Sequence, residues 1–596
     1  MRRAVVTALA AGALLASCRS GDPSMGGTTI RPRVGSSIAL LDEGRAVAVV
    51  DPDQGSVSIV DAETLASKGR VDVGGEPHAM LVDAAGLLRV TSYRGGQLVD
   101  VDPHTMAVVR KTAVCAGPWG LAESTDGREL AIACEWEDAV VRLDAVTLAV
   151  KARVEGLHRP RALAYVGDDL LIADFTGGRV TRVHPNGERE GRSLVPESAP
   201  VRPALTSMNA NLATALLPAL GDVYVVHVLV NNTGDASKEK IADDYGTVVD
   251  GNPKINPTLT RLGSSDAPVT YASYDAAKGR AFNGPAALAA YADRFLLIAH
   301  LSSNDVAMID GSSGAITRFS VGAGPRGIAV DEATHRAFVD NAFDGSITRL
   351  ALDTADGAAF TRTRPLPAVY SPSALAGRKI FHDATNPHVT PAGVVSCATC
   401  HPDGGDDGLI WFAHTARIPL KRRRTPHLAN ARTTTAPFHW NGEFATMHDL
   451  VRATMSDLMA GDGLLVDVDA VQAYVDEIVR APVPSTADAA TAERIDRGRA
   501  LFAGAAGCAG CHAGPDFTDD AMHAVLSPPS LQADDAITAV NTPGLHGLFL
   551  RAPLFHDGRA VDLASLLVQP DASAHGNAST LDEAQRADLL AYLRSL

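Results

Sequence analysis

Two short stretches shape the C-terminal half of this chain: CATCH at residues 397–401 and CAGCH at residues 508–512. Both have the Cys-x-x-Cys-His spacing by which c-type haem is attached to protein. The two thiols form thioether bonds to the haem vinyl groups, and the histidine binds the iron. The motifs therefore predict two covalent haems with His401 and His512 as proximal ligands. The attaching thiols would be those of Cys397, Cys400, Cys508 and Cys511.

Two other uses of paired cysteines fit these motifs less well. A zinc ribbon needs its Cys pairs about 15–20 residues apart, whereas these pairs are separated by about a hundred residues. A redox dithiol needs no histidine after its second cysteine, yet both pairs have one. Covalent haem is therefore the preferred interpretation of both motifs.

The composition of the chain limits its class. A length of 596 residues is enough for at least two domains. The net charge of -16 argues against nucleic acid as a partner. The 53 Gly and 34 Pro residues, with aromatic residues at only 5%, favour a turn-rich β architecture joined to a loop-rich haem module.

The N-terminus has the pattern of an export signal. Two arginines precede an apolar run that is too short to span a bilayer and ends in LASC, residues 15–18. This ending resembles the lipoprotein box of bacteria, which implies removal of residues 1–17 and lipidation of Cys18. Ordinary signal cleavage is the alternative. Residues 18–34 would then be a tether, and the mature protein is expected on the periplasmic face, anchored to a membrane by lipid only.

Apolar β-type segments recur about every 40 residues through much of the N-terminal half. Most are preceded by a Pro-led segment and followed by an alternating strand that ends in a turn former. They begin near Val47, Leu88, Leu130, Leu170, Val223, Phe295 and Arg336. This pattern predicts an all-β propeller of seven blades over residues 35–365, and it resembles the YVTN-type propellers. We expect this half to be a scaffold or docking face.

Two further features belong to the propeller. Residues 231–285 are an insertion at the fifth blade, for which contact with the haem domain and a solvated excursion are both open. In the third blade, a hairpin turning at residues 125–127 brings Cys115 and Cys134 close together across the ladder. In an exported protein this favours a disulfide, with two buried free thiols as the alternative.

The C-terminal half contains an internal duplication after a Pro-rich linker at residues 361–373. Gly-Arg-x-x-Phe stands before each haem motif, at residues 377–381 and 498–502. Thr-Pro, Ala-Pro and Ala-Tyr then recur in the same order, the last of them on an amphipathic helix. We therefore expect two mainly helical cytochrome c-like units, at residues 371–480 and 493–596.

The order of these motifs resembles the di-haem bacterial cytochrome c peroxidases and their MauG-type relatives. The resemblance implies that one haem receives electrons at high potential and that the other cleaves hydrogen peroxide. In that family a tryptophan of a Trp-Asp-Gly-Arg motif lies between the haems. Here the motif reads WNGE at residues 440–443. The resemblance thus makes Trp440 the candidate electron relay, with plain packing against a haem as the alternative.

The chain departs from the family where a peroxide site needs a proton donor. The peroxidases carry Glu-Met shortly after the tryptophan motif, whereas this chain has Asp457-Leu458-Met459. Cleavage of the O–O bond needs a proton shuttle beside an open iron position. Asp457, Glu443 and His439 are the candidates, so peroxidase activity rests on the resemblance rather than on these residues.

The duplication also suggests the sixth iron ligands. Aligned on their Ala-Pro and Gly residues, the two units place Met459 and His575 at the same position. Both side chains bind haem iron, and methionine raises the potential relative to a second histidine. We therefore expect Met459 on a higher-potential first haem and His575 on a lower-potential second haem, the reverse of the family's usual order. The alternative is that either residue only lines its pocket, and that the iron is open or bound by His414, His439 or His556.

Two charged groups have less specific interpretations. The basic segment at residues 421–424 is suited to neutralise haem propionates or to dock an acidic electron donor, and a solvated basic loop is the alternative. Asp403, Asp406 and Asp407 are candidate ligands of one calcium ion, which the family often holds between its domains.

These features together predict an exported di-haem oxidoreductase that carries a seven-bladed propeller. The expected reaction is reduction of hydrogen peroxide with electrons from a small donor protein of the cytochrome c or cupredoxin type. One alternative is a MauG-like oxidase of a protein or organic substrate. The other is a pure electron-transfer cytochrome whose propeller is a binding module.

Overall fold

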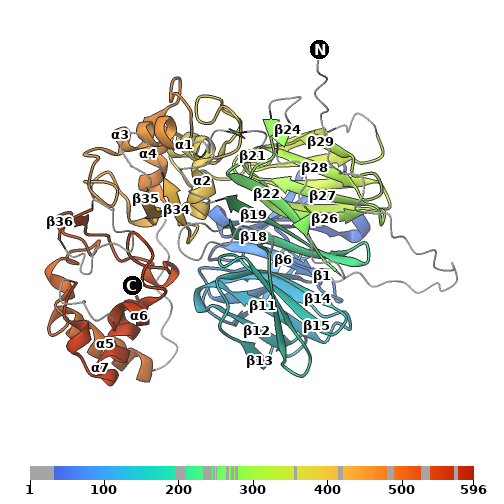
Figure 1. The fold of residues 1–596 in the computed structure, drawn as a ribbon. Helices are drawn as coiled ribbons and strands as arrows, with labels where there is room; N and C mark the ends of the chain where they lie inside the picture. The colour runs from blue at the N-terminus through green and yellow to red at the C-terminus, as the bar shows by residue number, and fades with distance from the viewer. Residues whose placement is uncertain are drawn as a thin grey trace, which may run out of the picture.

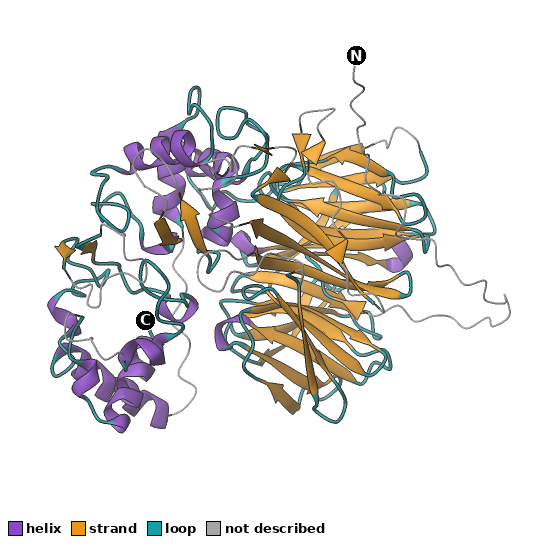
Figure 2. Cartoon of the chain, in the orientation of Figure 1, coloured by secondary structure: helices purple, strands orange, loops and turns teal. Residues whose placement is uncertain are grey.

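The computed structural model describes residues 33–195, 208–231, 245, 248–249, 252–263, 268–269, 274–275, 280–354, 359–413, 421–478, 489–524, 537–568 and 575–596. Within them, the N-terminal half is made of strands and the C-terminal half is mainly helical (Figure 1, Figure 2). The expected signal peptide and Cys18 lie outside the described residues.

The N-terminal half contains seven antiparallel blades whose neighbours pack against one another in a closed ring, so the predicted propeller is confirmed (Figure 1). Six blades are four-stranded sheets, and the third has a fifth strand, β1 (Arg33–Val34). Blades one to three are β2 (Ile38–Leu41), β3 (Ala46–Asp51), β4 (Ser56–Asp61), β5 (Ser67–Asp72); β6 (Pro77–Val82), β7 (Leu88–Ser92), β8 (Gln97–Asp102), β9 (Ala107–Ala113); and β10 (Pro118–Glu123), β11 (Glu129–Cys134), β12 (Ala139–Asp144), β13 (Val150–Val154).

The remaining four blades continue around the ring. They are β14 (Pro160–Val166), β15 (Asp169–Asp174), β16 (Arg179–Val183), β17 (Arg189–Ser193); β18 (Met208–Ala219), β19 (Asp222–Asn231), β22 (Ile255–Leu262), β23 (Pro268–Val269); β26 (Pro285–Tyr291), β27 (Phe295–His300), β28 (Asp305–Asp310), β29 (Ile316–Ser320); and β30 (Pro325–Asp331), β31 (Arg336–Asn341), β32 (Ser346–Ala351), β33 (Ala359–Thr363). Between β19 and β22 the insertion adds the short pair β20 (Val248–Val249) and β21 (Asn252–Pro253), and the pair β24 (Tyr274–Asp275) and β25 (Arg280–Ala281) follows β23.

Burial explains why the apolar repeat marks the blades. The apolar segments found in the sequence are the second strands, and every residue of β3 is buried because both faces of its blade meet neighbouring blades. In contrast, all five residues of β17 and of β33 are exposed at the outer rim. A strand covered on both faces is apolar throughout, whereas a rim strand is free to be polar.

The ring closes by packing of the first blade against the last. The Ser37 hydroxyl donates to Asp340 over 2.8 Å, and the Arg326 guanidinium donates to the Val50 carbonyl over 2.8 Å. The predicted tether is too long at its end, because β1 (Arg33–Val34) pairs with β10 of the third blade. Backbone hydrogen bonding therefore already holds the chain at residue 33.

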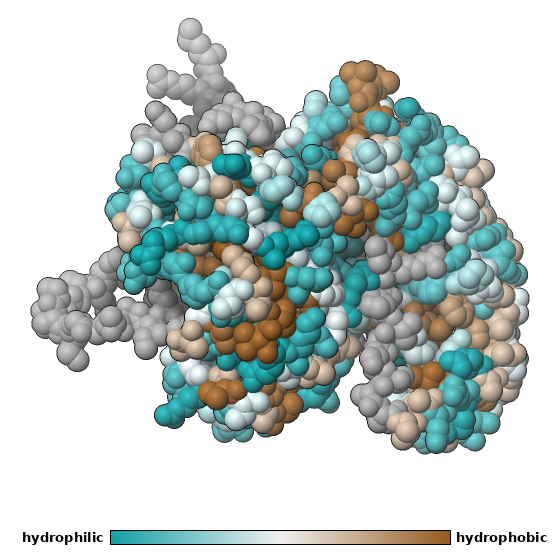
Figure 3. Space-filling model, turned by 180° about the vertical axis from the view of Figure 1, so that it is seen from behind, coloured by the Kyte–Doolittle hydropathy of each residue, from teal (hydrophilic) through white to brown (hydrophobic). Residues whose placement is uncertain are grey.

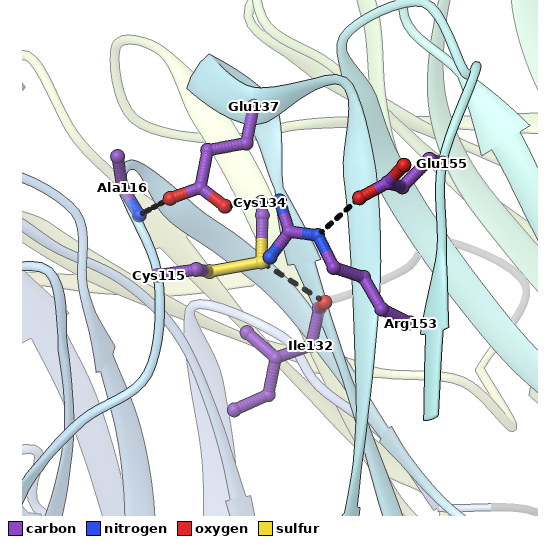
Figure 4. The surroundings of a disulfide bond; sticks show 7 residues. All are labelled: Cys115, Ala116, Ile132, Cys134, Glu137, Arg153 and Glu155. Atoms are coloured by element: carbon purple, nitrogen blue, oxygen red, sulfur yellow. Dashed lines mark hydrogen bonds and ion pairs between the residues drawn. A yellow bond between two sulfur atoms is a disulfide. The ribbon is translucent and has the colours of Figure 1, made fainter. Parts of the chain in front are cut away.

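The third blade carries a disulfide between Cys115 and Cys134, whose Cα atoms are 5.9 Å apart (Figure 4). Cys134 ends β11, where it pairs with Pro118 of β10, so Cys115 lies just beyond the start of the facing strand. Beside the disulfide, the Ala116 amide donates to Glu137 over 2.6 Å, and Glu137 also pairs with Arg153. The disulfide therefore holds the loop that leads into β10 against the end of β11.

The C-terminal half forms the two expected units. Unit one, here residues 372–478, contains α1 (Pro372–His382), α2 (Cys397–Cys400), β34 (Ile410–Ala413), β35 (Lys421–Arg424), α3 (Met447–Ala453) and α4 (Val468–Glu477). Unit two, here residues 489–596, contains α5 (Ala489–Ala503), β36 (Met522–His523), β37 (Val540–Asn541), α6 (Leu563–Leu567) and α7 (Glu583–Leu593). Helix α5 begins four residues before the predicted start of this unit, because three of the four residues in its first turn are alanine, the best helix former.

The same helix crossing builds both units. Helix α1 packs against α4, and α5 packs against α7. A Cβ atom on Gly377 would lie 1.8 Å from the Ala470 carbonyl oxygen, and one on Gly498 would lie 2.1 Å from that of Asp588. In each unit, the glycine of the Gly-Arg-x-x-Phe motif therefore stands where the backbones of two helices are in direct contact, which only glycine permits.

The propeller contacts unit one through several polar groups. Arg161 pairs with Asp403 over 2.7 Å, and the Asn283 amide donates to the Val394 carbonyl over 2.7 Å. The propeller also holds a cavity of about 1970 Å³ whose lining includes Ala398 and Thr399 of the first haem motif. Unit two contacts the propeller through the Trp136 and Phe549 rings, whose centroids are 5.6 Å apart.

The surface seen from behind is mixed, with hydrophilic residues over both halves and hydrophobic residues gathered in separate patches (Figure 3). Among the helices in the described part of the chain, none is long and apolar enough to cross a membrane.

Candidate haem sites

The first haem motif forms α2 and leaves its histidine ready to bind metal. The Nδ1–H group of His401 donates to the Gly405 carbonyl over 3.1 Å, which leaves Nε2 free. Burial lowers the pKa of His401 to about 4, so the imidazole is neutral, which is the ligating form. A histidine ligand is usually oriented by such a bond from its other ring nitrogen.

The second haem motif has the same arrangement and a further imidazole beside it. The Nδ1–H group of His512 donates to the Phe517 carbonyl over 3.0 Å. The ring centroid of His575 lies 6.1 Å from that of His512. Because metal–nitrogen bonds are about 2 Å long, two imidazoles on one iron have centroids about 6 Å apart. The geometry therefore suits His512 and His575 as the two axial ligands of one haem.

These side chains fit covalent haem at both motifs. The four motif cysteines are free thiols, although each Cys-x-x-Cys pair has the spacing of a disulfide. Cys397 and Cys400 pack against apolar clusters of unit one, and Cys508 packs against the core of unit two. Such surroundings match the apolar edge of a haem rather than a zinc ion, which would draw all four ligands together.

The pocket beside the first motif contains two buried methionines. Met459 is only 3% exposed and Met455 only 1% exposed, and both belong to the cluster that packs against Cys397 and Cys400. Met459 thus lies on the haem side of unit one, and its bond to iron stays a prediction. The same cluster contains Trp411, whose indole N–H donates to Asp407 over 2.8 Å.

Trp440 lies where the two units meet. Its indole N–H donates to the Arg424 carbonyl over 2.8 Å, and its ring centroid lies 6.3 Å from that of His556. Its own carbonyl accepts the Asn541 amide of unit two over 2.9 Å. Trp440 is therefore held by both units, the position required of a relay, while its role in electron transfer stays a prediction.

The basic segment at residues 421–424 has a structural part that the sequence did not reveal. Arg424 is buried and pairs with Asp406 over 3.0 Å, and it donates to the Arg551 carbonyl of unit two over 2.7 Å. Arg551 is also buried, and desolvation together with Arg424 lowers its pKa to about 9. Two buried guanidinium groups at the junction of the units suit anionic groups such as haem propionates.

The three aspartates considered for calcium are engaged elsewhere. Asp403 pairs with Arg161 of the propeller, and Asp406 pairs with Arg424. Asp407 accepts the Leu409 amide and the Trp411 indole N–H. Their carboxylates serve as partners of arginines and N–H groups, and a calcium ion stays a prediction.

The three candidate proton shuttles lie in two places. His439 and Glu443 form a pair over 2.6 Å in the loop before α3. Asp457 stands on the segment that leads into Met459 and accepts the Ser456 hydroxyl over 2.7 Å. The structure therefore does not gather the three candidates into one site.

Comparisons with known proteins agree with this arrangement. A cytochrome c family model matches residues 495–596. The methylamine utilization protein MauG of Methylorubrum extorquens is 30% identical over 277 residues, which cover 37% of this chain and 76% of that protein. The chain belongs to the cytochrome c peroxidase/MauG family. This confirms the family predicted from the motifs, and the protein is a haem oxidoreductase with covalently bound c-type haem.

Two solved structures show weaker similarity. The chain has 17% identity to hydrazine synthase of Kuenenia stuttgartiensis, with a TM-score of 0.44 over 56% of this chain and 99% of the other. It has 13% identity to a streptogramin B lyase, with a TM-score of 0.37 over 51% of this chain and 89% of the other. Similarity this low carries no functional argument.

Sequence reasoning missed Tyr245, Trp411 and Arg551, and it did not predict that Arg424 of the basic segment is buried. Tyr245 belongs to the propeller insertion, yet its ring packs in the pocket of the first haem motif. No repeat or motif marks it, because its position depends on contact between domains. Arg424 stands directly before Thr425-Pro426, whereas Arg551 stands directly before Ala552-Pro553, so the duplication did not pair the two arginines.

Proposed function

We propose that this MauG-family protein reduces hydrogen peroxide at the first haem and receives electrons through the second. This order rests on the axial ligands available in each unit, and it departs from the order of potentials expected from Met459 and His575, which would make the first haem the entry point for electrons. The observation that carries the proposal is the asymmetry of the motifs. His512 has a second imidazole, that of His575, at the distance expected across one iron. Unit one instead offers a buried pocket of methionine and aromatic side chains beside its motif. A doubly ligated iron suits electron transfer, whereas substrate needs an open position.

The residues of the chain support electron flow between the units. Trp440 is hydrogen-bonded to backbone groups of both, at the junction where Arg424 and Arg551 also meet. Reduction of one peroxide to two waters consumes two electrons and two protons. The electrons would come one at a time from a small redox protein, and haem would supply the redox chemistry of O–O cleavage.

The proposal places the reaction outside the cytoplasm, on a protein held to a membrane by the Cys18 lipid. The export pattern at residues 1–17 and the covalent haem motifs support this location. The acidic chain, with a net charge of -16, favours an electron donor with a basic docking face.

Stopped-flow spectroscopy of the purified full-length protein tests the proposal. Visible and EPR spectra are recorded for the oxidised and half-reduced forms, with and without peroxide. The half-reduced form is included because Met459, if it ligates, has to leave before peroxide binds. We expect one haem to react with peroxide while the other keeps a low-spin spectrum. Two low-spin haems that ignore peroxide in both forms would leave electron transfer as the function.

Oxidation of an organic or protein substrate is a second candidate, as in the MauG-like alternative. The propeller cavity of about 1970 Å³ favours this alternative, because its lining includes Ala398 and Thr399. These two residues lie between the two cysteines of the first haem motif. A substrate in this cavity would lie close to the first haem without entering its iron pocket. Peroxide consumption that depends on an added reductant of small size, rather than on a redox protein, would support this alternative.

A further inference from the structure

Tyr245, a described residue of the fifth-blade insertion, contacts unit one. The backbone amide of Tyr245 donates to the Leu458 carbonyl over 2.6 Å. Leu458 closes the π-helical turn at Thr454–Leu458 and directly precedes Met459. Tyr245 is therefore hydrogen-bonded to the segment that carries Met459, which the duplication predicts as the sixth ligand of the first haem.

The Tyr245 side chain is buried in the pocket of that haem. It is 5% exposed and shares a cluster with Met455, Met459 and Trp411. Its ring centroid lies 4.7 Å from that of Trp411. The same cluster packs against Cys397 and Cys400, the two points at which haem would be attached. A propeller residue is thus part of the wall of a cytochrome pocket.

A buried tyrosine hydroxyl usually has a hydrogen-bond partner, and a ligand on the iron would be one for the phenol group of Tyr245. A tyrosine hydroxyl carries its proton at neutral pH, because its ordinary pKa is about 10. A protonated hydroxyl in a haem pocket is able to donate a hydrogen bond to a small ligand on the iron.

We propose that Tyr245 is the hydrogen-bond donor of the first haem pocket, supplied by the propeller to a ligand at the sixth position of the iron. It would take the place of the glutamate that this chain lacks after its tryptophan motif. The proposal deepens the proposed function, because it assigns a residue to the same site. It also gives the insertion a role: the pocket of unit one is complete only with the propeller docked on it.

Fluoride binding tests this role without relying on turnover. Fluoride binds ferric haem and is stabilised by a hydrogen-bond donor in the pocket. The starting chain is full-length Met459→Ala, in which Met459 cannot occupy the sixth position. Fluoride affinity and the high-spin absorption band are then measured with and without Tyr245→Phe. Loss of a hydrogen bond to an anion should weaken binding about tenfold or more, with a shift of the band.

Tyr224→Phe in the same Met459→Ala background is the matched control. Tyr224 is also 5% exposed in the fifth blade, but it belongs to a cluster inside the propeller. It should leave fluoride affinity unchanged. Haem content and the low-spin signal of the second haem show that each variant is folded.

Two results would overturn the assignment. One is equal or tighter fluoride binding in Tyr245→Phe, which includes the case in which Tyr245 itself blocks the iron. The other is the absence of fluoride binding in both chains, which would mean that another group holds the sixth position. These results are distinct from failure of the proposed function, which is judged by the reaction of the unaltered protein with peroxide.

Discussion

The two cytochrome units share one plan but differ in what surrounds them. Both cross two helices at a glycine, and both aim a histidine by an Nδ1–H bond to a carbonyl. Unit one is joined to the propeller by an ion pair, by side-chain bonds to its backbone and by the Tyr245 amide. Unit two contacts the propeller through the Phe549 ring.

The difference extends to the haem pockets. His512 of unit two has His575 across from it within its own unit. The pocket of unit one includes a side chain from another domain. A duplicated fold thus keeps its helices and proximal histidines, and the copies diverge on the side where a sixth ligand or a substrate binds.

The largest expected effect is loss of one haem at a time. Cys397→Ala with Cys400→Ala should remove the first covalent haem, because no thioether can form, and Cys508→Ala with Cys511→Ala should remove the second. Acid-acetone extraction followed by mass measurement gives the haem count of each chain. If either double variant kept two covalent haems, the assignment of the motifs would be wrong.

Alanine at the crossing glycines should destabilise one unit each. The new Cβ would overlap a carbonyl oxygen, at 1.8 Å for Gly377 and 2.1 Å for Gly498. The helices would have to separate, at a cost of about 3 kcal/mol or more in the free energy of unfolding. Soret absorbance during urea unfolding reports each unit separately in chains that retain one haem motif.

The control for this pair is Asp496→Ala on the same helix as Gly498, because the exposed Asp496 side chain pairs with the exposed Arg499 at the surface. It should leave the unfolding midpoint of unit two nearly unchanged. Equal midpoints for Gly498→Ala and Asp496→Ala would contradict the account of the helix crossing.

Removal of the disulfide should weaken the propeller and spare the haems. Cys115 and Cys134 close a loop with a sequence separation of 19 residues. Opening such a loop costs about 3 kcal/mol, chiefly through the entropy of the unfolded chain. Calorimetry of the Cys115→Ala/Cys134→Ala variant should show a lower propeller transition, with visible spectra unchanged. Altered haem spectra would show that the third blade supports the haem units more strongly than the contact between the Trp136 and Phe549 rings suggests.

The smallest effect concerns acid stability at the cavity between the propeller and unit one. Burial disfavours the Glu76 carboxylate, but His78 and Arg94 outweigh it and lower its pKa to about 2. Because this pKa lies below that of the unfolded chain, the stabilisation is present above about pH 4.5 and is lost as the pH falls toward 2. Glu76→Gln should remove at most about 2 kcal/mol of stability at pH 6 and almost none near pH 2. Thermal unfolding at both pH values measures this, and an equal loss at the two would contradict the assigned pKa shift.

Much of the fold could be predicted because it repeats. Seven apolar second strands gave the blade number, and the Gly-Arg-x-x-Phe repeat marked both crossing helices. Motif spacing also predicts His401 and His512 as proximal ligands, and their bonds to iron stay predictions. The sequence could not place Tyr245, because its position depends on a loop from one domain closing the pocket of another. Nor did it predict that Arg424, the last residue of a basic segment, would be buried against unit two, because burial follows from packing.

The most direct test of the asymmetry is low-temperature EPR of the full-length protein beside His575→Ala. The account predicts a low-spin signal from His512 and His575 that ignores fluoride and peroxide, and that becomes high-spin in His575→Ala. It predicts that the other haem reacts with peroxide in the oxidised or half-reduced form of both proteins. An unchanged low-spin signal in His575→Ala would contradict the claim that unit two carries the closed haem.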